Sequence, residues 1–131
     1  MNRKSTIEYI VNTYVCERDH PWAKYPDYEV FRHPNNRKWF ALIMSIPKMR
    51  IGLAGDEVID VVNLKCDPAF IGSLLHESGF YPAYHMNKTH WITVALDETA
   101  SDDLLKIALD MSFATTAAKR KREPNSAKIK Q

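Results

Sequence analysis

Cys66, His85 and His90 are the residues best suited to metal binding, because thiolates and imidazoles are ligands that zinc prefers. Asp67, beside the cysteine, could add a carboxylate. The interval between Cys66 and His85 matches no zinc-finger or zinc-ribbon spacing, and the two histidines flank a predicted turn instead of sharing one helix face. The sequence therefore predicts no metal site. A buried structural thiol with two surface or half-buried histidines is the simpler interpretation.

Cys66 is also the candidate nucleophile. Lys65 and the N-terminus of the following helix would lower the pKa of its thiol, and His85 or His90 would act as the base. No glycine that could form an oxyanion hole neighbours the cysteine. The chain also contains no glycine-rich phosphate loop, nucleophile elbow or carboxylate pair. We therefore expect neither enzymatic activity nor a cofactor.

A run of basic residues between Val30 and Arg50 could contact phosphate groups. This segment contains no acid and five basic residues, which are Arg32, Arg37, Lys38, Lys48 and Arg50. Asn35 and Asn36, at the tip of a predicted loop, could read base edges. A solvated hairpin surface would have the same composition, so the segment by itself indicates only a local positive charge.

The formal net charge of +2 conceals two parts of opposite sign. Residues 119–131 contain six Lys or Arg and one Glu, a net charge of +5, so residues 1–118 hold 12 basic and 15 acidic residues, a net charge of −3. Overall basicity therefore gives no argument that the folded domain binds nucleic acid. Any such binding must use one polarised face, and the basic tail alone would add salt-sensitive affinity.

The length and composition fit one globular domain. Of the 131 residues, 45% are hydrophobic and 26% charged, which disfavours a coiled coil, a solenoid or a disordered protein. The longest apolar run, residues 39–44, is far shorter than the ~20 residues of a membrane span. Two cysteines and the lack of an apolar leader after Met1 favour a reducing compartment. We expect a monomeric cytoplasmic domain over residues 1–118, no membrane partner, and a disordered tail over residues 119–131.

Hydrophobic periodicity predicts three helices. Ser5 and Glu8 form a capping-box pattern at the start of an amphipathic helix over residues 6–17. Asp67 would cap a short second helix and Ser101 a long third one. Their predicted apolar faces contain Phe70, Ile71, Leu74 and Leu75 in the second helix, and Leu104, Ile107, Ala108, Met111 and Ala118 in the third.

Apolar runs and alternating patterns predict five strands. Two of them, residues 26–32 and 39–45, are joined by a polar loop, and a third covers residues 58–64. Residues 84–94 have the pattern of a tight hairpin in which Asn87 adopts a positive φ. Aromatic residues of these strands are expected in the core. The order helix, three strands, helix, two strands, helix favours an α+β domain whose antiparallel sheet is covered on one face.

Two segments carry a combination of residues that is more specific than any motif above. They read Val62-Asn63-Leu64-Lys65-Cys66-Asp67-Pro68 and Tyr84-His85-Met86-Asn87-Lys88-Thr89-His90-Trp91-Ile92-Thr93-Val94. This combination resembles the bacterial MmcQ/YjbR family, and residues 38–42 and 111–113 extend the resemblance over most of residues 1–118. Phe113 stands where the family often has tyrosine, and Ala83 where it often has glycine.

The resemblance implies an α+β fold similar to that of type III secretion chaperones. Members of the family are labelled DNA-binding because two projecting hairpins look like a pair of wings. In this sequence the wings would be the loop around residues 36–38 and the hairpin around Asn87 and Lys88. The family's signature positions are Lys65, His85, Asn87, Lys88, His90 and Trp91.

These signature residues could form one cationic cluster. In an antiparallel strand pair the side chains of His85, Lys88 and His90 would lie close together, and Lys65 on a neighbouring element would join them. Such a cluster suits a phosphate or a carboxylate, and it would strengthen as the histidines protonate near about pH 6.5. Alternatively, Lys65 and a histidine pair with carboxylates of the domain and only stiffen the sheet.

The leading hypothesis is a DNA-binding protein that contacts phosphates through its two wings. The residues expected to bind nucleic acid or another anion are Arg37, Lys38, Lys65, His85, Asn87, Lys88 and His90. The competing hypothesis is a non-enzymatic binding or chaperone-like module for a protein or a small anionic ligand. It predicts an exposed apolar patch or a closed pocket beside His85.

Overall fold

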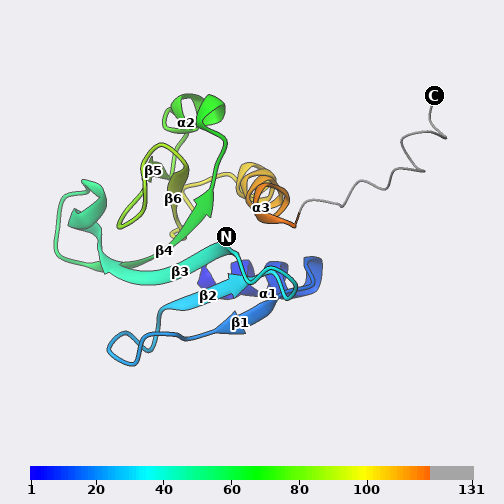
Figure 1. Cartoon of the computed structure of the whole chain (residues 1–131). Helices are drawn as coiled ribbons and strands as arrows, with labels where there is room; N and C mark the ends of the chain where they lie inside the picture. Colours follow the sequence, from blue (N-terminus) through cyan, green and yellow to red (C-terminus); the bar gives the residue numbers. More distant parts are fainter. Residues whose placement is uncertain (119–131) are drawn as a thin grey trace, which may run out of the picture.

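A six-stranded antiparallel sheet organises residues 1–118, the part of the chain that the computed structural model describes (Figure 1). The elements in chain order are α1 (Arg3–Thr13), β1 (Glu17–Asp19), β2 (Glu29–Arg32), β3 (Trp39–Pro47), the 3-10 helix η1 (Lys48–Ile51), β4 (Val58–Lys65), α2 (Pro68–Leu74), β5 (Phe80–Pro82), β6 (Trp91–Ala95) and α3 (Asp102–Thr116). The predicted α+β class with an antiparallel sheet is confirmed. The disordered tail predicted for residues 119–131 lies outside the described residues. None of the helices in residues 1–118 is long and apolar enough to cross a membrane.

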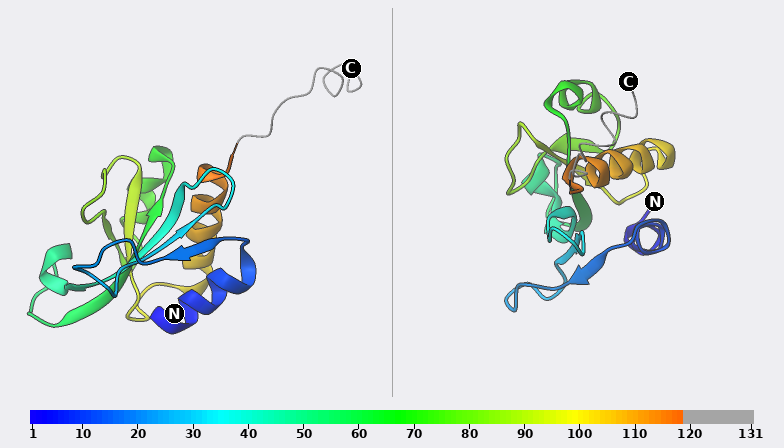
Figure 2. Two further views of the ribbon diagram at one scale, coloured as in Figure 1. Left: turned by 60° about the horizontal axis from the view of Figure 1, so that its bottom comes forward. Right: turned by 45° about the vertical axis from the view of Figure 1, so that its right-hand side comes forward.

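The sheet separates two apolar cores. Its strand order is β1-β2-β3-β4-β6-β5. Ile10 of α1, Leu74 of α2 and Leu109 of α3 belong to the core on one face, and both views of Figure 2 show α1 and α3 side by side on this face. Side chains alternate along a strand, so Leu42 and Met44 of β3 belong to the other core. Segments between the strands add partly buried aromatic rings there.

The first helix begins and ends earlier than predicted. Asn2 caps it: the side-chain oxygen of Asn2 accepts a hydrogen bond from Ser5 N at 2.9 Å, and Ser5 Oγ accepts one from Asn2 N at 3.0 Å. Asparagine is as good an N-cap as serine, so the capping box starts at Asn2 instead of Ser5. The helix ends at Thr13, and part of the predicted helical segment forms β1. The three residues of β1 are exposed and charged, so no apolar pattern indicates a strand.

The other two helices begin at their predicted caps. Asp67 Oδ1 accepts a hydrogen bond from Ala69 N at 2.9 Å, and Ser101 Oγ accepts one from Leu104 N at 3.2 Å. The predicted apolar faces are only partly right, because Phe70 and Ile107 are exposed. The buried residues of α3 are Leu105, Ala108, Leu109, Ser112 and Thr116, and hydrophobic spacing does not find the two polar ones.

A β-bulge sets the side-chain directions at the start of β3. Phe31 pairs with Ala41, but Arg32 pairs with Trp39, so Phe40 is an extra residue in β3. Phe40 therefore enters the core on the helix face, whereas Trp39 packs on the opposite face. Ser112 of α3 fixes this end of the sheet: its Oγ donates to Phe40 O at 2.5 Å and accepts a hydrogen bond from Lys65 N at 2.8 Å.

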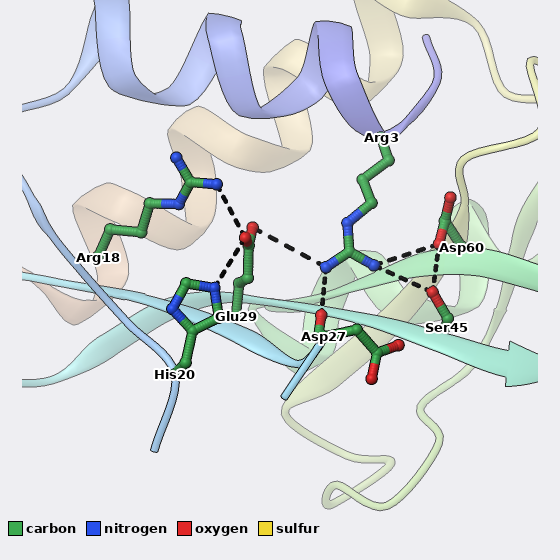
Figure 3. Close-up of polar contacts among 7 residues, drawn as sticks. All are labelled: Arg3, Arg18, His20, Asp27, Glu29, Ser45 and Asp60. Atoms are coloured by element: carbon green, nitrogen blue, oxygen red, sulfur yellow. Dashed lines mark hydrogen bonds and ion pairs between the residues drawn. The ribbon is translucent and has the colours of Figure 1, made fainter. Parts of the chain in front are cut away.

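A buried carboxylate, Glu29 of β2, links this strand to α1 and to β1 (Figure 3). Glu29 Oε1 accepts a hydrogen bond from Arg18 Nη2 at 2.8 Å and lies 2.9 Å from His20 Nε2. Glu29 Oε2 lies 3.9 Å from Arg3 Nη2 of α1. Burial alone raises the pKa of Glu29, but the hydrogen bonds from Arg18 and His20 and the charges of Arg18 and Arg3 hold it below its usual value. Glu29 is therefore an ionised group with three basic neighbours.

Candidate nucleic-acid interface

A basic groove lies at the end of the sheet where β3 begins, β4 ends and β6 begins. The last turn of α3 forms another part of its wall. The volume of the groove is about 380 Å³, and its lining residues are Arg37, Lys38, Trp39, Lys65, Trp91, Thr115 and Thr116. Three of the predicted anion-binding residues, Arg37, Lys38 and Lys65, therefore meet at one site beside two tryptophans.

The strand register places Lys65 in this groove. Lys65 of β4 pairs with Trp91 of β6, and its Nζ lies 5.5 Å from the centroid of the Trp91 ring, a cation–π contact. Lys65 forms no ion pair with any residue of 1–118. The alternative in which Lys65 pairs with a carboxylate is therefore wrong for this part of the chain.

The first predicted wing, the loop around residues 36–38, is held against the end of α3. Asn36 Nδ2 donates to Thr116 O at 2.9 Å, and Asn36 Oδ1 accepts a hydrogen bond from Lys38 N at 2.9 Å. The amide of Asn36 is therefore used inside the protein, contrary to the predicted role in reading base edges. The hydrogen bond from Asn36 also satisfies the carbonyl of Thr116 at the C-terminus of α3. The negative end of the helix dipole lies there and disfavours anions. Arg37 has a φ of 65°, in the left-handed region that non-glycine residues rarely adopt.

Acidic residues neutralise part of the basic segment between Val30 and Arg50. Arg37 pairs with Glu17, and Arg32 Nη2 lies 2.7 Å from Asp19 Oδ2; both acids belong to β1, the strand that the sequence did not predict. Lys48 Nζ lies 3.4 Å from Glu57 Oε1. Lys38 in the basic groove and the exposed Arg50 of η1 are thus the basic residues of the segment that have no ion pair within residues 1–118.

The second predicted wing is a loop of residues 83–90 between β5 and β6, longer than the predicted tight hairpin. His85, with a φ of 60°, takes the left-handed conformation expected of Asn87. Asn87 Oδ1 instead accepts hydrogen bonds from Thr89 N at 2.7 Å and His90 N at 3.2 Å. Asn87 therefore shapes the turn through its side chain.

The structure divides the predicted cationic cluster between two neighbouring depressions. Lys65 lines the basic groove, whereas His85 lines a second one, which we call the aromatic pocket. Lys88 and His90 are exposed in the loop and line neither. The aromatic pocket has a volume of about 350 Å³ and is lined by Trp22, Tyr25, Tyr28, Trp39, Leu42, Met44, His85 and Met86. It lies beside His85, where the competing hypothesis predicts a closed pocket, but it is open to the surface.

Cys66 lacks the environment of a reactive thiol. It is 2% exposed, and burial, with a smaller effect of the Asp67 charge, raises the pKa of its thiol. The predicted lowering of this pKa by Lys65 and the helix N-terminus is therefore wrong. Within residues 1–118, no group of three or more His, Cys, Asp or Glu side chains is arranged to hold a metal ion.

His33 is a buried histidine at the base of the first wing. Its Nε2 lies 2.9 Å from Thr116 Oγ1, and its ring lies 4.3 Å from that of Phe113. Burial lowers the pKa of His33 below its usual 6.5, and a hydrogen bond with the backbone of Phe113 offsets this only in part. Since the unfolded chain binds this proton more readily, we expect the free energy of unfolding to fall as the pH drops below about 6.5.

Urea unfolding at about pH 7.5 and about pH 5.5 measures this effect. His33→Gln is expected to reduce the difference in unfolding free energy between the two pH values. His76→Gln, a change at an exposed histidine, is the matched control and should leave the difference unchanged. Equal pH dependence in the wild type and the His33 variant would show that burial of His33 does not oppose its protonation.

Hydrophobic alternation alone misses the aromatic residues of the site. Trp39 and Trp91, expected in the core, are only partly buried and line the groove. Trp22, Tyr25 and Tyr28 lie close together between β1 and β2. Three aromatic rings in a short segment with prolines and charges are the sequence signal that could have indicated a binding surface.

The fold and these two depressions define a small α+β domain with its three α-helices on one face of the sheet and a basic groove at one end. The chain belongs to the YjbR family, whose model matches residues 12–115. It is 35% identical over 116 residues to the uncharacterized protein YyaQ of Bacillus subtilis (strain 168), covering 88% of this chain and 98% of that protein. It is 40% identical over 58 residues to the uncharacterized protein YbdF of Escherichia coli O157:H7, covering 42% of this chain and 46% of YbdF.

Solved structures agree with the fold. A crystal structure of a Pseudomonas syringae protein has a TM-score of 0.86 and 48% identity, covering 89% of this chain and all of that one. A solution NMR structure from the same organism has a TM-score of 0.85 and 45% identity, covering 95% of this chain and 99% of that one. A Deinococcus radiodurans protein shares the fold. Its crystal structure has a TM-score of 0.67 and 22% identity, covering 98% of this chain and 88% of that one.

Proposed function

We propose that this protein binds nucleic acid, such as DNA, by holding phosphate groups in the basic groove. The observation that carries the proposal is the meeting of Arg37, Lys38 and Lys65 beside Trp39 and Trp91. Arginine and lysine donate charge-assisted hydrogen bonds to phosphate, and tryptophan rings provide surfaces on which bases stack. Because the domain itself carries a net charge of −3, the binding is weak and confined to this end of the sheet.

The two lysines of the groove outweigh the negative end of the α3 dipole, which amounts to about half a charge, and they support an anionic ligand. Lys38 and Lys65 have no carboxylate partner within residues 1–118. Arg37 and its partner Glu17 are both exposed, and exposed ion pairs contribute only about 0–1 kcal/mol, so a phosphate can replace the carboxylate. The hydrogen bonds of Asn36 hold the loop in place before a ligand arrives, which lowers the entropic cost of binding.

The experiment separates the groove from the basic tail. A short DNA duplex is titrated at several salt concentrations into the wild-type chain and into a full-length variant. The variant has Lys119, Arg120, Lys121, Arg122 and Lys128 changed to Gln, which brings the net charge of residues 119–131 from +5 to zero. We expect this neutralised-tail variant to bind, with an affinity that falls with salt along a slope of about −3, corresponding to three phosphate contacts. Loss of all binding in the variant would assign binding to the tail, and a wild-type chain that binds no DNA would contradict the proposal.

Glu17→Gln is expected to raise the affinity for DNA about twofold to fivefold, because it frees Arg37 from its exposed ion pair. The measurement is the same titration on the neutralised-tail variant. Asp19→Asn removes the same charge from β1 but frees Arg32, which does not line the groove. An equal gain in both variants would indicate a general charge effect and contradict the role of Arg37.

A second candidate function is a binding module for a small anionic ligand. The aromatic pocket beside His85 favours it, because a volume of about 350 Å³ lies within the range of small-molecule sites. This candidate predicts saturable binding of a single phosphorylated ring compound. The nucleic-acid proposal predicts instead that affinity increases with the number of phosphates.

A further inference from the structure

The aromatic pocket is built from three separate parts of the chain. Leu42 and Met44 of β3 are buried and form its floor. The segment between β1 and β2 contributes a wall of three aromatic rings, and the loop of residues 83–90 contributes His85 and Met86. The pocket therefore opens between two loops on the face of the sheet that has no α-helices.

Some aromatic rings of the pocket stack in parallel, and others meet edge to face. Tyr25 and Tyr28 are stacked, with ring centroids 4.8 Å apart and an angle of 17° between the planes. Trp22 meets Trp39 edge to face at 5.4 Å and 84°, and it meets Tyr28 in the same manner at 6.0 Å and 80°. Tyr25 is 44% exposed, so part of this aromatic wall is open to a ligand. Such walls suit a planar ring, which gains contact area by stacking.

Trp39 joins the aromatic pocket to the basic groove, because it lines both. Arg37, Lys38 and Lys65 lie on the groove side of this residue. Aromatic cages also bind organic cations, but three basic side chains next to the pocket would repel a cation. A ligand that fills both depressions therefore combines a flat ring with an adjacent anionic group.

We propose that the aromatic pocket takes one unpaired base of a single-stranded nucleic acid while the neighbouring phosphate lies in the basic groove. The inference rests on the proposed function and names its substrate class. In a duplex the bases are stacked and paired, so a base reaches the pocket only if it is flipped out at an energetic cost. Single strands present unpaired bases without this cost.

The test compares three ligands of about ten nucleotides, a length near the site size of single-strand binding domains. They are an oligothymidylate, a fully abasic oligomer with the same phosphates, and a duplex. With the neutralised-tail variant, we expect the oligothymidylate to bind about tenfold or more tightly than either of the others. Tyr25→Ala is expected to lower the affinity for the oligothymidylate about tenfold and to leave the affinity for the abasic oligomer unchanged.

Phe70→Ala is the matched control, because it removes an exposed aromatic ring of α2 that lines neither depression, and it should change neither affinity. Tyr25 is exposed, so its removal should leave the fold intact, which a circular dichroism spectrum checks. Equal affinity for the oligothymidylate and the abasic oligomer would overturn the inference and leave phosphate binding in the groove standing. Thymidine monophosphate bound as tightly as the oligothymidylate would overturn it in favour of the small-ligand module. Failure to bind any oligomer would overturn the proposed function as well.

Discussion

Lys65→Glu is expected to lower the affinity of the neutralised-tail variant for DNA by about tenfold or more. The substitution removes a charge-assisted hydrogen bond to phosphate and places a negative charge at the centre of the basic groove. It should weaken binding to all DNA sequences similarly, because phosphate contacts carry no sequence information. The salt slope of the affinity should also become shallower by about one or more.

The matched control for this prediction is Lys106→Glu. Lys106 of α3 lies over Tyr9, with its Nζ 5.2 Å from the ring centroid, as Lys65 lies over Trp91 at 5.5 Å. The two substitutions thus make the same change of charge and remove the same type of cation–π contact. Lys106→Glu should change the affinity little, because Lys106 does not line the groove. A large loss in a Lys88→Glu variant with none in Lys65→Glu would place the site on the 83–90 loop and contradict the assignment to the groove.

Glu29→Gln is expected to lower the free energy of unfolding by about 2 kcal/mol at neutral pH. Glu29 is buried and neutralises Arg3, Arg18 and, when protonated, His20. An amide of nearly the same shape leaves Arg18 without a carboxylate partner within residues 1–118, whereas Arg3 keeps its ion pair with Asp60 at 3.2 Å. Loss of the Arg18 pair costs more than the loss of one hydrogen bond. Urea unfolding measures the change. Asp19→Asn is the control: it removes the charge of a half-exposed carboxylate that pairs with one arginine, Arg32, and should cost less than Glu29→Gln.

The effect of Glu29→Gln should depend on pH. Because the pKa of Glu29 is lowered in the folded state, its contribution to stability is present above the usual value of 4.5 and is lost as the pH falls through the folded pKa. The wild type and the variant should therefore converge in stability in acid. A cost for Glu29→Gln that equals that of Asp19→Asn, or that does not decrease in acid, would show that the ion cluster does not stabilise α1 against the sheet.

Features that depend on a single segment could be predicted from the sequence. The caps at Asp67 and Ser101 need only a side chain that reaches its own helix, and both are confirmed. The apolar runs of β3 and β4 also predict their strands. β1 could not be predicted, because its three exposed residues form a strand only by pairing with β2. The missed strand matters for the site, since Glu17 pairs with Arg37.

The sequence predicts which types of residue form the candidate site, but it does not predict which of them lie together. Arg37, Lys38 and Lys65 are recognisable as anion-binding residues, but their convergence depends on the strand register and on the position of α3. The register places Lys65 opposite Trp91, instead of beside His85. The direction of His85 follows from its left-handed backbone and from the length of its loop, which a hairpin pattern does not specify.

The most direct test of the basic groove is an NMR titration of the full-length, isotopically labelled wild-type chain with the oligothymidylate. We predict that the largest shift changes occur at the indole N–H groups of Trp39 and Trp91 and at the backbone amides of Arg37, Lys38 and Lys65. Shift changes confined to residues 119–131, with these signals unmoved, would contradict the account, because nucleic acid would then be bound by the tail alone.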